Sequence, residues 1–595
     1  MWRSRSRTRT LGAALPAILL LILTACNQAP PPAAPKGPSA ASQQWSRTAN
    51  SFIEDYMTNQ PAFAAVAGRH EYDGKLPDLS SHGIKREIAR LHDQQQQLSA
   101  VDASKLQPRE RFDRAYLLAV IDKDLFWLEK SGFPFNNPYW YMGQIDPDLY
   151  LSRNYAPLDV RMKAYIKYAK AIPHMAASIK ENLKSPMPKT YVELGIDQFG
   201  GLATFYTKNV AAVFASVSDP ELQKQLADAD KDAAAAMTAL KDYLVGERKN
   251  ANDKFVLGPD AFALMVKQTE QVDMPIDKIE AAGRADLERN TAALKTECAT
   301  YLPKASLAQC VAKMGANKPK GSPVEEARNQ LKMLKEFVAK NNVVSIPNGD
   351  EALVAEAPPY NRANFAFINP SGPYEKGVVS IYNIAPPDPK WPKAEQAAYI
   401  PGEAILLFTS VHEVWPGHFL QFLHSNANPN KLESVWVGYA FAEGWAHYAE
   451  EMMWDMGLNK GDAESHVGQL SEALLRDVRL LSAIGLHTHG MTVAQSEKMF
   501  REQAFQDPGN ARQQASRGTY DPAYLNYTLG KLMIRKLRTD WLAKTAGGAS
   551  TPGGSPPAEG DQSRWHEFHD QFLSFGGPPI PMLRKELVGE GGDLL

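Results

Sequence analysis

The heptapeptide HEVWPGH (His412–His418) and the following run FAEGWAHYAEE (Phe441–Glu451) determine how this chain is interpreted. The heptapeptide places two imidazoles and a carboxylate close together, and the second run adds further carboxylates. Imidazole nitrogens and carboxylate oxygens are the ligands that zinc takes in hydrolytic sites. The two stretches together therefore predict a hydrolytic zinc site.

The spacing of the two histidines differs from the usual zinc helix, in which they lie four residues apart on one face. His418 follows His412 by six residues, a rotation of about 600°, so a regular helix would leave it about 240° away. Pro416 lacks an amide hydrogen and clashes with the carbonyl group of His412, and Gly417 tolerates many backbone conformations. We therefore expect the helix to open between Trp415 and Gly417 and to bring His418 back towards His412. Otherwise His418 only caps the broken helix end.

A third zinc ligand is expected from the next helix, because a catalytic zinc ion takes three protein ligands and keeps one position for water. Glu443, His447 and Glu450 follow one another there at helical spacing, near one face. We expect Glu443 to be the ligand, since the small residues around it allow another backbone to approach. His447 is the rival ligand or a partner that supports one. Glu450 and Glu451 fit a solvated acidic edge better.

The histidine distribution supports a site in this part of the chain, because seven of the thirteen histidines lie within residues 412–489. In hydrolysis, Glu413 would take the proton of the attacking water. The oxyanion that develops needs a hydrogen-bond donor besides the metal. Tyr527 is the first candidate for this donor, and His487 or His489 are the alternatives.

Two further features are candidates for contact with a substrate. Arg479 could bind a substrate carboxylate, although a structural ion pair is the commoner role of such an arginine. The predicted strand Gly377–Tyr382 could offer its edge to an extended peptide, with Tyr382 as a binding residue.

Three stretches resemble the DUF885 family of bacterial proteins, which is identified with gluzincin-like metallopeptidases carrying the signature HExxPGHxxQ. They are HEVWPGHFLQ (412–421), EGWAHYAEE (443–451) and DPAYLNYTLGKL (521–532). The resemblance extends to GRHEYDGKLPDLS (68–80) and FHDQFLSFGGPPIPMLR (568–584), and so covers most of the chain. The stretched histidine spacing is also similar to that of dipeptidyl peptidase III.

This resemblance implies one zinc ion per chain, with His412, His418 and Glu443 as ligands and Glu413 as the general base. It also implies hydrolysis of a peptide substrate. The chain departs from the family pattern at Ala483, where many relatives carry an Asp before the segment G-L-H. If that Asp supports a histidine of the site, the outer part of the site differs here.

Helical periodicity dominates residues 43–342 and returns after the motif. The expected N-terminal helices include Ile84–Leu98, Pro108–Leu128, Leu158–Leu183, Pro220–Leu244, Pro275–Leu294 and Pro323–Val338. Residues 360–385 indicate β structure, with two short strands flanking the turn Asn369–Gly372. We expect a mainly α-helical protein with a small sheet or hairpin near the metal site. The family resemblance makes this a large helical zincin-like (gluzincin) architecture.

The first 25 residues have the composition of a secretory signal, with four arginines before an apolar run too short to span a membrane well. Leu23–Cys26 (LTAC) resembles a bacterial lipobox, in which Cys26 becomes the lipidated first residue. Residues 26–42, rich in proline and alanine, are expected to form an extended tether. We therefore expect a periplasm-facing lipoprotein of the bacterial envelope that touches the membrane only through its lipid. Asn27 favours the outer membrane, and an ordinary cleaved signal is the alternative.

The charge balance gives no reason to expect nucleic acid as a partner. The chain has 65 Lys+Arg and 67 Asp+Glu, a net charge of −2. Residues 1–25 contain four arginines and no acidic residue, so their removal changes the net charge to −6. Cys298 and Cys310 then remain. In an oxidising periplasm we expect them to form a disulfide, and two unpaired thiols are the alternative.

The chain is expected to form one continuous family domain over about residues 43–590, with a helical region (43–345) and a catalytic region (346–595). The function that fits best is hydrolysis of peptide bonds, in short peptides, by metal-activated water. One alternative is a metal-dependent amidase acting on cell-wall peptide. Another is a non-catalytic envelope lipoprotein with a degenerate site, but a structural zinc site has no use for a free carboxylate such as Glu413.

Overall fold

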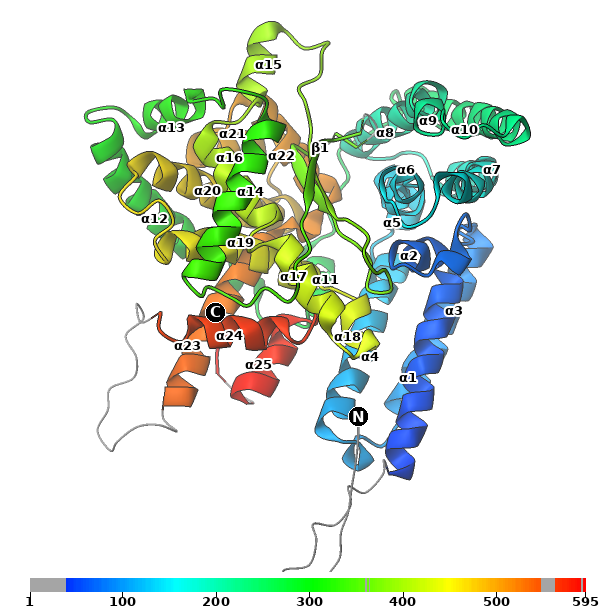
Figure 1. Ribbon diagram of the computed structural model, residues 1–595, viewed down its shortest axis with the longest axis horizontal. Helices are drawn as coiled ribbons and strands as arrows, with labels where there is room; N and C mark the ends of the chain where they lie inside the picture. Colours follow the sequence, from blue (N-terminus) through cyan, green and yellow to red (C-terminus); the bar gives the residue numbers. More distant parts are fainter. Residues whose placement is uncertain (1–38, 359–360, 363, 547–561, 590–591) are drawn as a thin grey trace, which may run out of the picture.

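The computed structural model describes residues 39–358, 361–362, 364–546, 562–589 and 592–595. The predicted signal segment, Cys26 and most of the predicted tether lie outside the described residues. Helices make up 70% of the structure and strands 3%, so the prediction of a mainly helical protein with a small sheet is confirmed (Figure 1). Among the helices described, none is both long and apolar enough to cross a membrane.

The N-terminal part consists of helices that largely match the predicted ones. Its first helix begins at Ala40, where the side chain of Ser39 accepts a hydrogen bond from the amide of Ser42. Residues 40–42, predicted as the end of the tether, therefore belong to this helix. The helices are α1 (Ala40–Asn59), α2 (Pro61–Val66), α3 (Ser81–Ser99), α4 (Pro108–Leu125), α5 (Phe133–Asn136), α6 (Asp148–Ser152), α7 (Leu158–Asn182), α8 (Lys189–Lys208), α9 (Val210–Val213), α10 (Pro220–Glu247), α11 (Pro259–Glu270), α12 (Ile276–Tyr301), α13 (Leu307–Ala316) and α14 (Pro323–Lys340).

Two large hydrophobic cores hold the molecule together. The smaller one lies mainly among α7, α8 and α10, which gather on one side of the molecule in Figure 1, and α8 also contacts the C-terminal helix α22 (Pro508–Tyr520). The larger core contains residues of α1, α4 and α11–α14 together with the C-terminal helices. The main core thus crosses the boundary expected at residue 345, because helices on both sides of that position bury their apolar faces against one another.

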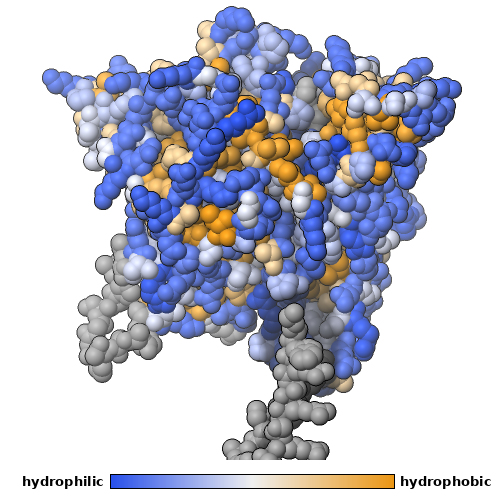
Figure 2. All heavy atoms as spheres, in the orientation of Figure 1, coloured by the Kyte–Doolittle hydropathy of each residue, from blue (hydrophilic) through white to orange (hydrophobic). Residues whose placement is uncertain are grey.

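The sheet has three short strands in the order β1-β3-β2: β1 (Leu353–Glu356), β2 (Ala366–Asn369) and β3 (Ile381–Ile384). β2 and β3 are antiparallel, with Ile368 opposite Tyr382, as the predicted hairpin requires. β1 pairs in parallel with the other side of β3. The expectation that the strand ending at Tyr382 offers a free edge is therefore wrong, since β3 is central and the edges belong to β1 and β2. Hydrophobic residues gather on the surface around β1 (Figure 2), where Leu353 is 58% exposed.

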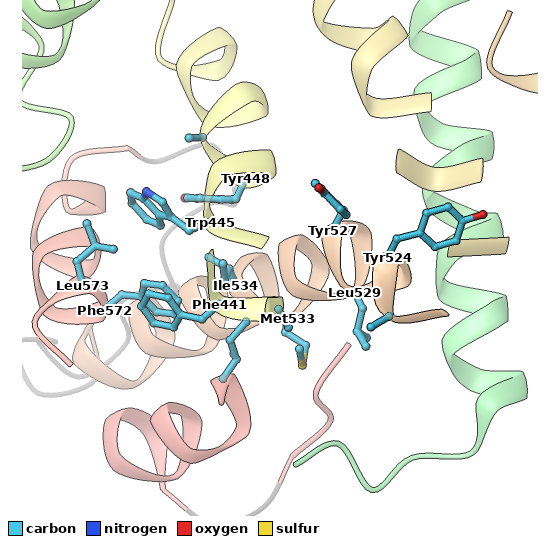
Figure 3. Packing of buried hydrophobic residues seen from close by; sticks show 14 of the residues in the cluster. Phe441, Trp445, Tyr448, Tyr524, Tyr527, Leu529, Met533, Ile534, Phe572 and Leu573 are labelled. Atoms are coloured by element: carbon cyan, nitrogen blue, oxygen red, sulfur yellow. The ribbon is translucent and has the colours of Figure 1, made fainter. Parts of the chain in front are cut away.

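The C-terminal helices surround the motif. They are α15 (Lys393–Tyr399), α16 (Glu403–Glu413), α17 (His418–Ala427), α18 (Lys431–Val435), α19 (Tyr439–Asp455), α20 (Ala463–Thr488), α21 (Val493–Gln503), α22 (Pro508–Tyr520), α23 (Asn526–Ala546), α24 (Trp565–Leu573) and α25 (Ile580–Val588). Aromatic residues of α19 pack on α24 (Figure 3), and the rings of Phe441 and Phe572 stack 4.6 Å apart. α19 also packs along α23, and α12 along α20.

A disulfide joins the end of α12 to α13. The bond links Cys298 to Cys310, whose side chains are both buried. α13 lines the large cavity described below, through residues such as Ala308 and Val311. The disulfide therefore holds one wall of that cavity against the core.

Replacing both Cys298 and Cys310 with Ser is expected to lower the free energy of unfolding by about 3 kcal/mol, because a closed loop of this length restricts the unfolded chain. Urea denaturation of the two proteins measures the difference. The wild-type protein treated with a reductant should unfold at the same urea concentration as the variant. Equal stability of oxidised and reduced wild type would contradict the expectation.

Candidate metal centre

The helix that carries the first motif histidine breaks where the sequence predicts. α16 ends at Glu413 and α17 begins at His418, and the peptide bond between them at Pro416 is cis. The amide of Gly417 donates to the carbonyl of Val411 at 3.0 Å. A Cβ atom on Gly417 would lie 1.8 Å from the carbonyl oxygen of His412, so this close approach admits only glycine. The predicted opening of the helix is confirmed.

The break brings three side chains of two separate segments together. Oε2 of Glu443 lies 3.2 Å from Nε2 of His412 and 3.2 Å from Nε2 of His418. The rings of the two histidines are nearly perpendicular, with centroids 4.8 Å apart. Among the described residues this is the only group of three metal-ligating side chains whose ligand atoms all lie within 4.8 Å of one another.

These three residues fit a zinc ion. Two ligand atoms bound at about 2.1 Å to a tetrahedral zinc ion are about 3.4 Å apart, close to the separations from the Glu443 carboxylate to both imidazoles. The field at the site is negative. Burial alone would lower the pKa of His412, but hydrogen bonds to Glu443 and Glu450 outweigh it and raise that pKa to about 9. A site that holds a proton this firmly also attracts a cation.

The far side of His412 is fixed by a buried ion pair that sequence analysis missed. Nδ1 of His412 lies 2.6 Å from Oε1 of Glu450, which Arg476 also contacts at 3.1 Å. Glu450 is fully buried rather than on a solvated edge, so that expectation is wrong. His447 is not among the converging ligand atoms: its Nδ1 lies 3.4 Å from Glu450, and burial lowers its pKa to about 4. It therefore remains neutral and supports Glu450.

Glu413 stands beside the three potential ligands at the cavity wall. Its side chain is 7% exposed, and burial raises its pKa although the two nearby histidines lower it. A backbone hydrogen bond from Ile368 of β2 also opposes the rise. A carboxylate with an elevated pKa next to a metal site is suited to accept a proton from water.

The cavity next to the site has a volume of about 920 Å³. Its walls come from α13, α16, α20, α22 and the segment before α16, and β2 contributes Ala366, Phe367 and Ile368. The three potential ligands and Glu413 also line it. A substrate in this cavity would therefore lie between the metal site and the edge strand β2.

Tyr527 reaches the cavity from α23. Its ring stacks on that of His412 with centroids 6.1 Å apart. A close crossing of two helices places it there, since a Cβ on Gly444 of α19 would lie 2.5 Å from the Cα of Gly530. Burial raises the pKa of Tyr527, so its hydroxyl stays protonated, and this hydroxyl accepts a hydrogen bond from Arg517 at 3.4 Å. Its own hydrogen is then free to be donated into the cavity.

The histidines considered as alternatives to Tyr527 lie elsewhere. His487 is buried against Phe262, 2.8 Å from the carbonyl of Gly518, and does not line the cavity. His489 is 2.9 Å from Glu280 near the surface. The assignment of His487 to catalysis is therefore wrong, because the end of α20 points away from the metal site.

Two other sequence expectations concern buried residues. The side chain of Tyr382 is fully buried in the central strand and does not line the cavity, so it is not a substrate contact. Ala483 lies in the hydrophobic core and is also absent from the cavity wall. An Asp at that position would lie one helical turn from His487 rather than beside the potential ligands. The departure from the family pattern therefore leaves the metal centre intact.

Comparisons with solved structures show the fold. A protein described as a lipoprotein of unknown function, from Shewanella oneidensis, is 22% identical with a TM-score of 0.71, covering 91% of this chain and 99% of its own. A similarly described lipoprotein from Colwellia psychrerythraea is 17% identical with a TM-score of 0.76, covering 92% and 99%. No curated protein matches the chain. The model of a family described as "Bacterial protein of unknown function (DUF885)" matches residues 61–587, and the chain therefore belongs to this family.

Proposed function

We propose that this protein is a zinc-dependent metallopeptidase that hydrolyses peptide bonds in short peptides. The observation that carries the proposal is the convergence of His412, His418 and Glu443 beside the carboxylate of Glu413, at the wall of a large cavity. Three protein ligands and one open position are typical of catalytic zinc sites. The gluzincin-like family signature found in the sequence supports the same chemistry.

The residues of the chain divide the reaction among them. His412, His418 and Glu443 would hold the zinc ion, whose Lewis acidity would bring the pKa of water close to neutrality. Glu413 accepts the proton of the attacking water and passes it to the departing amine. The hydroxyl of Tyr527 donates a hydrogen bond to the oxyanion that forms on the attacked carbonyl. Glu450, backed by Arg476, holds Nδ1 of His412 so that Nε2 faces the carboxylate of Glu443, where the three ligand atoms would hold the ion.

The shape of the cavity supports short peptides as substrates. A volume of about 920 Å³ suits a ligand of small-molecule size better than a folded protein. β2 is an edge strand that lines this cavity, so its free side can pair with the backbone of an extended peptide. Such pairing would fix the cleaved bond against the zinc ligands.

We also propose that the protein is a lipoprotein of the bacterial envelope, anchored through Cys26 and facing the periplasm from the outer membrane. The lipobox-like sequence ending at Cys26 supports this, and the two proteins of the same fold are themselves described as lipoproteins. Labelling cells with a palmitate analogue should mark the wild-type protein and leave Cys26→Ala unlabelled.

Replacing Glu413 with Gln is expected to leave one zinc ion per chain but to lower kcat on short peptides by about 10²- to 10⁴-fold, because the amide cannot accept a proton. Elemental analysis and a peptide-hydrolysis assay measure the two quantities. Glu403→Gln, at the other end of the same helix, is the matched control and should behave like wild type. A purified protein that neither contains nor takes up zinc would refute the proposal.

Replacing Glu450 with Gln is expected to weaken zinc binding by about 10- to 100-fold, since His412 loses the charged partner of its Nδ1. Competition with a zinc chelator measures the affinity. Glu413→Gln, which removes a carboxylate without a role in binding, should keep the wild-type affinity. A folded Glu450→Gln protein with unchanged affinity would show that this contact does not tune the site.

Replacing Tyr527 with Phe is expected to reduce kcat by about 10²- to 10³-fold with little change in KM, because the lost hydroxyl acts on the transition state. Zinc content should stay the same. Steady-state kinetics on one peptide tests this. An unchanged kcat would remove Tyr527 from the mechanism.

A further inference from the structure

Arg479 is a buried cation in the cavity wall that no carboxylate of the described residues pairs with. Its side chain is 7% exposed and lines the cavity. Its Nε donates to Oε1 of Gln514 at 2.8 Å, and its guanidinium carbon lies 4.7 Å from the ring centroid of Tyr527. Among the described residues no salt bridge to Arg479 is formed, so the structural ion pair considered in the sequence analysis is not present.

The other arginines of this wall have their charges balanced. Arg476 contacts Glu450 and Glu472, and Arg517 contacts Asp521 at 2.9 Å. Two other carboxylates of the cavity wall have partners of their own. Glu472 is paired with Arg476, and Asp507 accepts hydrogen bonds from the first amides of α22. Neither is engaged with Arg479.

An unbalanced buried charge is unfavourable unless an anion completes it. The surroundings of Arg479 increase the cost of burying its charge. Burial lowers its pKa, and the positive charges of Arg517 and Arg476 lower it further. The guanidinium group therefore stands in a positive region of the cavity wall.

Tyr527 relates Arg479 to the reaction centre. The same ring lies 4.7 Å from the guanidinium carbon and 6.1 Å from the ring of His412. One residue of an extended peptide spans roughly 3.3–3.6 Å. If the carbonyl group of the cleaved bond lies at the zinc site, a group one or two residues further along the peptide would therefore reach Arg479.

We propose that Arg479 binds the free C-terminal carboxylate of the substrate, so that the enzyme removes one or two residues from the carboxyl end of short peptides. The planar guanidinium group matches a carboxylate with two parallel hydrogen bonds, and Nε is already fixed by Gln514, which orients the group. This inference rests on the proposed peptidase function and adds the substrate class and the direction of cleavage.

The test compares one short peptide with a free C-terminal carboxylate and the same peptide with a C-terminal amide. The zinc-loaded wild-type protein should cleave the free acid with a kcat/KM about 100-fold higher. Arg479→Gln should lose most of this preference, because its kcat/KM should fall for the free acid and change little for the amide. Arg479→Lys should keep part of the preference because it keeps the charge. Arg512→Gln, at an exposed arginine of α22 outside the cavity wall, is the matched control and should resemble wild type.

A binding measurement keeps this inference separate from the peptidase proposal. Glycyl-phenylalanine and its C-terminal amide are titrated into Glu413→Gln protein by calorimetry. The free acid should bind at least about 10-fold more tightly, and Arg479→Gln in the same background should remove the difference. Absence of cleavage with this binding preference retained would refute the peptidase function but not the carboxylate site.

Three results would overturn the inference. Equal binding and equal cleavage of acid and amide would show that Arg479 does not recognise the terminus. If Arg479→Gln lowers kcat/KM equally for both peptides, Arg479 only positions Tyr527. If chloride raises the activity of the wild-type protein on both peptides but not that of Arg479→Gln, a free anion occupies the site instead.

Discussion

The contact between Gly417 and the carbonyl group of His412 is the constraint on which the site depends. There is no room for a side chain between them, and the amide of Gly417 is held by Val411. This turn ends α16 directly after Glu413 and starts α17 at His418. A helix that continued would place the second imidazole on another face. A continuous helix would separate His412 and His418. The break makes them neighbours that can share one metal ion.

A second close approach brings the remaining parts of the centre to the same place. α19 and α23 cross at Gly444 and Gly530 with their backbones in contact. Glu443 precedes the crossing on one helix and Tyr527 lies one turn before it on the other. The carboxylate ligand and the phenol are therefore positioned by the same packing. Large residues at either glycine would push the helices apart and move both groups away from His412.

The buried charges of the centre are arranged in two layers. Glu450, Arg476 and Glu472 form an ion-paired chain behind His412, which restrains the imidazole. On the cavity side, the amide oxygen of Gln514 is the only hydrogen-bond partner of Arg479 among the described residues. An ion-paired layer suits a fixed scaffold, while an unpaired cation at a cavity wall suits a ligand that brings its own negative charge.

The sequence alone determined the local features: most of the long helices, the hairpin before the motif, the opening at Pro416 and Gly417, and the two converging histidines, with Glu443 and His447 as rivals for the third position. These follow from periodicity, from the stereochemistry of proline and glycine, and from ligand chemistry, all of which act over short distances. Tertiary structure alone decided the outer parts of the centre. It buried Glu450 next to Arg476, turned His487 away, placed β3 between two strands and left Arg479 without a carboxylate partner in the part of the chain that the structure describes. Each of these depends on which distant segment packs against a helix face, and the spacing of residues within one helix carries no information about that partner.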